Sequence, residues 1–188
     1  MQVQPGPPAP PPETKDWTWV VETPCAECGY DPAAVDVTGD LGPRVLAAAA
    51  ALGEAAVAPG GRDRPSPLVW SPLEYAAHVR DTCRIGAQRV RLMQDEDGAR
   101  FPNWDQDAAA VEGRYWEGDP ARVRTDLAEA AAEVVRRFAS VTPEQWGHRG
   151  LRSNGSAFTV DTLARYFLHD LEHHVHDVAP GRAAGGGA

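Results

Sequence analysis

The chain has 188 residues, of which 27 are acidic and 18 are basic, so its formal charge is −9. This acidic balance argues against clusters of Lys and Arg, so we expect neither a nucleic-acid partner nor attachment to an anionic membrane surface. No apolar run approaches the ~20 residues of a membrane helix, and the N-terminus lacks the pattern of a secretory signal. Three cysteines are an odd number, which argues against a disulfide scaffold and favours a reducing cytoplasm.

The length fits a single domain between two irregular ends. Residues 1–15 form a Pro-rich leader, which we expect to be disordered or extended on the surface. Residues 181–188 are mostly Gly and Ala, which is typical of a flexible tail. The domain is therefore expected over residues 16–180.

Helix signals dominate this domain. The clearest start is a capping box in which Ser71 is the cap, Pro72 takes the first helical position and Glu74 reaches back. Apolar residues at helical spacing, caps and Gly or Pro stops predict four helices. Their ranges are 41–58, from residue 72 to before residue 98, 120–138, and from near residue 159 to about residue 178.

Strand signals are nearly absent, apart from a short alternating run at residues 17–21. Residues 101–118 are rich in Trp, Asp, Asn and Gly, and residues 149–157 are polar, so both stretches are predicted to be loops. The predicted fold class is all-α, a four-helix bundle with an extended Pro-rich N-terminal segment.

Four of the six histidines lie between Tyr166 and His176, in the fourth predicted helix. His169 and His173 share one face of that helix, one turn apart, so both can reach a single metal ion. His78, early in the second helix, is the obvious third ligand. Three protein ligands with open positions are typical of a catalytic metal. The alternative is that these are surface or core histidines, which is how we interpret His148 and His176.

Three stretches resemble the DinB-like superfamily, over about residues 41–178: Trp-Ser-Pro-x-Glu-x-x-x-His at 70–78, Phe-Pro-Asn-Trp-Asp at 101–105, and His-x-x-x-His-His at 169–174. The superfamily includes thiol-dependent S-transferases and the N-terminal domain of mycothiol-dependent maleylpyruvate isomerase. The resemblance implies a four-helix bundle that binds zinc or nickel through His78, His169 and His173. In the isomerase branch the first ligand of the last helix is a Glu. This chain has His169 there, nearer the S-transferase pattern.

The resemblance implies a metal-dependent enzyme, a transferase or isomerase that activates a low-molecular-weight thiol such as mycothiol for attack on an electrophilic small molecule. A divalent metal would generate the thiolate at neutral pH. The sequence has no nucleophile elbow, phosphate loop or dinucleotide fingerprint, and we assign no catalytic side chain. A metal-dependent hydrolase and a non-catalytic, stress-associated metal-binding bundle are the alternatives. A homodimer is left open.

Other residues are candidates for supporting roles around the metal. An imidazole that ligates a metal usually donates its second N–H to a carboxylate. The candidate carboxylates are Asp81, Asp170 and Glu172, although each could equally be solvated. Five residues are candidates for a substrate pocket, and among them Trp104 could instead plug the end of the bundle. The five are Tyr75, Trp104, Asp105, Arg152 and Tyr166.

The Cys25-Ala-Glu-Cys28-Gly motif has the spacing of half a zinc site or of a redox pair. A closed zinc site needs two further ligands, and the chain has no second Cys-x-x-Cys. We therefore interpret the pair as part of a loop that packs near Trp17 and Trp19, with no catalytic role. Cys83 lies on the apolar face of the second helix and is expected to be a small buried side chain.

Overall fold

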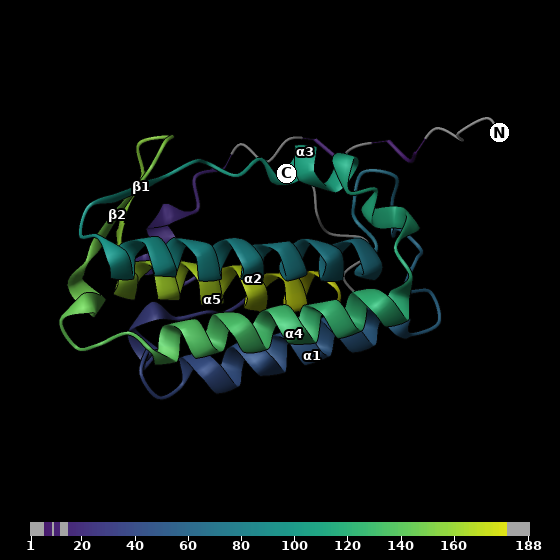
Figure 1. Cartoon of the computed structure of the whole chain (residues 1–188). Helices are drawn as coiled ribbons and strands as arrows, with labels where there is room; N and C mark the ends of the chain where they lie inside the picture. The colour runs from purple at the N-terminus through teal and green to yellow at the C-terminus, as the bar shows by residue number, and fades with distance from the viewer. Residues whose placement is uncertain (1–5, 9, 12–14, 180–188) are drawn as a thin grey trace.

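The computed structural model describes residues 6–8, 10–11 and 15–179. Four long helices lie side by side (Figure 1), with α4 packed most extensively on α1 and α2, and α5 packed on α1 and α2. Their bounds are α1 Leu41–Val57, α2 Pro72–Asp95, α4 Pro120–Ala139 and α5 Val160–Asp177. The predicted four-helix bundle is confirmed, and its helices begin and end within about two residues of the predicted positions.

Side-chain caps set where these helices begin. At α2, the Ser71 hydroxyl accepts from the Glu74 backbone N–H, and the Glu74 carboxylate accepts from the Ser71 backbone N–H, as predicted. Asp119 caps α4, and Thr159 caps α5 through a reciprocal pair with Thr162. The apolar faces then meet in one core, whose fully buried members include Leu52, Leu73, Leu127 and Leu168.

A small three-stranded sheet lies at one end of the bundle (Figure 1) and is absent from the prediction. Strand β2 (Arg149–Arg152) pairs in parallel with β1 (Ala99–Phe101) and antiparallel with β3 (Ala157–Thr159). The prediction that 149–157 is a loop was wrong. Strands of three or four residues are too short for period-2 alternation to stand out in the sequence.

Short helices occupy other stretches predicted to be loop or strand. Residues 101–118 include α3 (Gln106–Glu112), which Asp105 caps, and the 3₁₀ helix η3 (Tyr115–Glu117). The run at 17–21 is mainly the 3₁₀ helix η1 (Thr18–Val21). Two further 3₁₀ turns are η2 (Pro32–Ala34) and η4 (Gln145–Gly147).

The two ends of the chain fall mostly outside the described residues. The predicted tail at 181–188 lies wholly outside them, and so does most of the predicted leader. Within the leader, residues 6–8 and 10–11 form neither helix nor strand, and the Pro8 carbonyl accepts a hydrogen bond from Arg64 at 2.6 Å. No helix in the described part of the chain is long and apolar enough to cross a membrane.

Candidate metal centre

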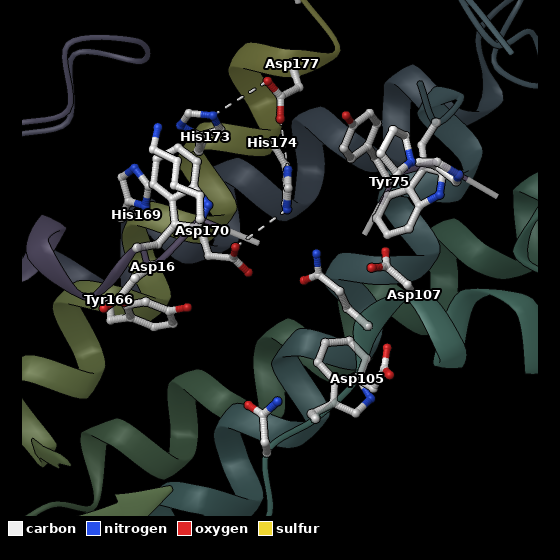
Figure 2. Close-up of a pocket in the computed structure, with 18 of the residues that line it drawn as sticks. Asp16, Tyr75, Asp105, Asp107, Tyr166, His169, Asp170, His173, His174 and Asp177 are labelled. Carbon is white, nitrogen blue, oxygen red and sulfur yellow. Dashed lines mark hydrogen bonds and ion pairs between the residues drawn. The ribbon is translucent and has the colours of Figure 1, made fainter. Parts of the chain in front are cut away.

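One pocket of about 720 Å³ lies beside α5, between the N-terminal segment and the loop that leads into α3. All five residues predicted to form a substrate pocket line it: Tyr75, Trp104, Asp105, Arg152 and Tyr166. Figure 2 shows this arrangement, with side chains from α5 on one side of the cavity and Asp105 and Asp107 on the other. Several further carboxylates line the pocket, which gives it an acidic character: Asp16, Asp107, Asp170 and Asp177.

Three side chains have ligand atoms within 4.8 Å of one another: Asp170 and His174, which line this pocket, and His78, which is buried beside them. The Asp170 carboxylate lies 3.9 Å from His78 Nε2 and 3.6 Å from His174 Nε2. A tetrahedral ion with N and O ligands at 2.0–2.2 Å would separate its ligand atoms by about 3.3–3.6 Å. To hold one divalent ion, the separations between these ligand atoms therefore need to shorten by at most about 1.5 Å.

Aromatic rings hold His78 in place. Its side chain is 1% exposed and lies beneath Trp104, whose ring stacks on it at 5.5 Å between centroids and 8° between planes. Trp70, the residue before the cap of α2, packs against the same imidazole at 5.2 Å. Burial lowers the pKa of His78 well below its ordinary value, so the imidazole is neutral, which is the form that binds metal.

A carboxylate orients His174. Its Nδ1 lies 3.0 Å from Asp177 Oδ2, while its Nε2 faces Asp170. Figure 2 shows His174 between these two aspartates. A histidine that ligates metal through one nitrogen commonly donates its other N–H to a carboxylate, which fixes the tautomer. Burial raises the pKa of Asp170, and the neighbouring His174 and His173 oppose that rise.

The structure places His169 and His173 apart from His78. They form a second group with Cys25 and Cys28, in which one ligand atom of each residue lies within 4.8 Å of the others. Consecutive residues on a helix point about 100° apart, so the pair 169/173 and the pair 170/174 face different neighbours. Sequence reasoning chose the first pair because both of its members are histidines. The Asp170-x-x-x-His174 spacing, with Asp177 three residues later, is the sequence signal for the grouping with His78, and sequence reasoning did not use it.

The remaining candidate carboxylates and histidines of the sequence analysis lie outside both groups. Asp81 accepts from Tyr115 at 2.6 Å and pairs with Arg80, whereas Glu172 forms a two-pronged ion pair with Arg44. These two carboxylates therefore pair with side chains other than a histidine. Among the described residues, neither metal-binding group includes His148 or His176, and His148 Nδ1 lies 2.7 Å from the Met93 carbonyl oxygen.

The sequence matches the DinB superfamily over residues 44–178. The chain belongs to this superfamily. No curated protein matches it in sequence. Among solved structures, this DinB protein is similar to YfiT from Bacillus subtilis, described as a probable metal-dependent hydrolase with an unusual four-helix bundle topology. The two share 16% identity over 75% of this chain and 85% of YfiT, with a TM-score of 0.63, a likeness that concerns the fold.

Proposed function

We propose that this DinB protein is a metal-dependent enzyme whose divalent ion, zinc or nickel, is held by His78, Asp170 and His174. The observation that carries the proposal is the convergence of these three groups, two of which, Asp170 and His174, line a large pocket. Two neutral imidazoles and one carboxylate are a donor set that suits either metal, and three protein ligands leave positions for water or substrate. This set replaces the one expected from the sequence, which joined His78 to His169 and His173.

The surrounding residues orient the proposed ligands and shield them from water. Trp70 and Trp104 exclude water from the His78 ring, which keeps the imidazole neutral. Asp177 holds the His174 ring by its Nδ1, so that Nε2 points toward Asp170. The Asp170 carboxylate supplies the negative charge that a divalent ion would offset in a partly buried site.

We propose that the nucleophile is a small thiol such as mycothiol, which attacks an electrophilic small molecule in a transfer or isomerisation. What supports a thiol from solution is that, among the described residues, no cysteine lines the pocket. A bound divalent ion polarises oxygen atoms and favours ionisation of a coordinated thiol or water. A carboxylate followed four residues later by a histidine resembles the isomerase branch, in which the first ligand of the last helix is a Glu.

A metal-dependent hydrolase is the second candidate. What favours it is the fold shared with YfiT, the protein described as a probable metal-dependent hydrolase. The same centre would then activate water, and no thiol would be needed. A non-catalytic metal-binding bundle is the remaining alternative, although a pocket of about 720 Å³ beside the ligands supports an enzyme.

The test uses the full chain, purified without a histidine tag and loaded with zinc or nickel. Protein is incubated with an electrophilic dye, with and without a panel of low-molecular-weight thiols, and with ester and amide substrates. We expect conjugation that needs both metal and thiol. His174→Ala should lose this activity and one equivalent of metal, whereas His148→Ala should keep both, since His148 contacts a backbone carbonyl elsewhere.

The other outcomes separate the alternatives. Turnover of esters or amides without thiol would assign the hydrolase function. Tight metal binding with no turnover in either assay would leave only the non-catalytic bundle. Equal metal retention in the His174→Ala and His148→Ala variants would refute the ligand assignment itself.

A further inference from the structure

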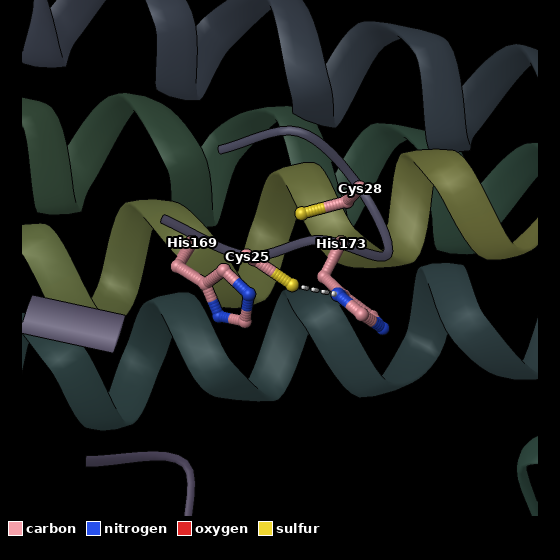
Figure 3. A group of neighbouring side chains, drawn as sticks. All are labelled: Cys25, Cys28, His169 and His173. Carbon is pink, nitrogen blue, oxygen red and sulfur yellow. Dashed lines mark hydrogen bonds between the residues drawn. The ribbon is translucent and has the colours of Figure 1, made fainter. Parts of the chain in front are cut away.

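A second cluster of side chains that could ligate a metal lies where the Cys-x-x-Cys turn meets α5, and two of its members, His169 and His173, also line the pocket. Cys25, His169 and His173 are buried, with exposures of 1%, 3% and 8%, and Cys28 is half-buried. Cys25 Sγ lies 3.8 Å from His173 Nδ1. Figure 3 shows the Cys25 sulfur between the two imidazole rings and the Cys28 side chain on the same side of α5.

The turn is built so that both thiols face the helix. The Gly29 N–H donates to the Cys25 carbonyl and the Cys25 N–H donates to the Tyr30 carbonyl, each at 2.8 Å. Gly29, directly after the second cysteine, has a φ of +78°, a backbone conformation that favours glycine. The Tyr30 hydroxyl donates to the Arg165 carbonyl at 2.9 Å, which fastens the turn to α5.

The spacing of the four ligand atoms fits a tetrahedral zinc ion. Zn–S distances of about 2.3 Å and Zn–N distances of about 2.0–2.1 Å imply separations of about 3.3–3.8 Å between ligand atoms. Cys25 Sγ and His173 Nδ1 are already 3.8 Å apart, and all four atoms lie within 4.8 Å of one another. Closing the cluster therefore needs the separations between ligand atoms to shorten by at most about 1.5 Å.

The environment of the two histidines also points to a ligand. His169 Nε2 is buried and has no hydrogen-bond partner among the described residues. His173 directs Nδ1 toward Cys25, and its Nε2 faces Glu27 at 3.6 Å and Asp177 at 3.8 Å. Carboxylates on the far side of a ligating imidazole are typical of zinc sites. Trp17 packs on both rings, at 5.4 and 4.9 Å, and covers the cluster.

We propose that Cys25, Cys28, His169 and His173 bind a structural zinc ion that fastens the N-terminal segment to α5. Four protein ligands close the coordination shell, so this site stabilises structure and leaves no position for substrate. Binding converts both thiols to thiolates and releases two protons to solvent. The ion would join Cys25 to His173, 148 positions apart in the chain, and its binding free energy would add to that of folding. The site shares no ligand with the proposed catalytic centre.

The test uses the full-length chain without a histidine tag, with Co²⁺ as the spectroscopic probe and Zn²⁺ for stoichiometry. We expect Co²⁺ to produce thiolate-to-metal charge-transfer absorption together with tetrahedral visible bands, and Zn²⁺ to displace it. Cys25→Ser should abolish the thiolate absorption and remove one equivalent of zinc per chain. The control is Cys83→Ala, which changes a buried cysteine on α2 outside the cluster and should keep both.

Two further variants keep the test decisive. Cys28→His retains a ligating atom, so it should keep zinc with weaker thiolate absorption even where Cys25→Ser does not fold. His174→Ala should keep the thiolate absorption in full, because it affects only the catalytic centre. A cobalt spectrum without thiolate absorption would overturn the proposal, as would thiol counting that finds Cys25 and Cys28 joined by a disulfide in metal-loaded protein.

Discussion

Asp177 is the residue whose substitution tests the proposed catalytic centre most directly. Its Oδ2 lies 3.0 Å from His174 Nδ1 and so fixes the tautomer that presents Nε2 toward Asp170. Asp177→Asn keeps the size of the side chain and an oxygen acceptor but removes the charge. Carboxylates in this position typically contribute 10- to 100-fold to metal affinity. We therefore expect zinc to bind more weakly by about 1.4–2.7 kcal/mol.

The assay is a titration in which the protein competes with a chromophoric chelator for zinc. It is repeated with variants that also carry Cys25→Ser, so that zinc binding at the two sites is distinguished. Asp161→Asn is the matched control. It makes the same change on the same helix, at a carboxylate that pairs with Arg165 at 2.8 Å. If Asp177→Asn and Asp161→Asn bind zinc as tightly as the unaltered chain, Asp177 does not orient a metal ligand and the reasoning fails.

Three further predictions concern stability. Arg64→Met leaves the Glu74 carboxylate, 2% exposed, without its cation, so we expect the free energy of unfolding in urea to fall by about 3–5 kcal/mol. The double variant with Glu74→Gln should recover part of this loss. An Arg64→Met variant as stable as the unaltered chain would contradict the argument. Gly150→Ala places a Cβ 2.6 Å from the Phe101 ring and should lower the free energy of unfolding by about 1–3 kcal/mol. Gly147→Ala, whose Cβ would meet no atom within 4 Å, should leave it unchanged. Equal stabilities of the two variants would refute this. Stripping divalent ions with a chelator should lower the melting temperature, since an ion at 100 times its Kd contributes about 2.7 kcal/mol; a constant melting temperature after proven metal loss would count against both sites.

The sequence predicts those parts of the fold that rest on local signals. The capping box from Ser71 to Glu74 and the Asp119-Pro120 start are chemical devices of a few neighbouring residues, and they lie where predicted. The sheet was missed because its strands have only three or four residues, and because the β1–β2 pairing joins residue 99 to residue 150, a non-local contact that no short window reports. The α3 helix was missed because its seven residues make only about two turns and carry little periodicity.

The site was predictable in its residue types but not in its grouping. His78, His169 and His173 all lie in clusters that could hold a metal ion, and His78 lies in a different cluster from the other two. The rotation of α5 about its own axis decides which pair of residues faces α2, and that rotation depends on packing along the whole helix. For the same reason, sequence reasoning assigned His169 and His173 to one centre with His78, whereas the structure groups them with Cys25 and Cys28.

The two proposed metal sites have different tasks, and α5 connects them. It supplies two ligands to each group, and Asp177 near its end faces a ring from both, through Oδ2 to His174 and Oδ1 to His173. The N-terminal segment that the cysteine site would fasten also supplies Lys15, Asp16 and Trp17 to the pocket lining. A closed zinc site at Cys25 would therefore hold this segment, in which η1 and η2 are short 3₁₀ turns, against α5 as one wall of the pocket. The proposed open site, with three protein ligands, would keep its remaining positions for the reactants.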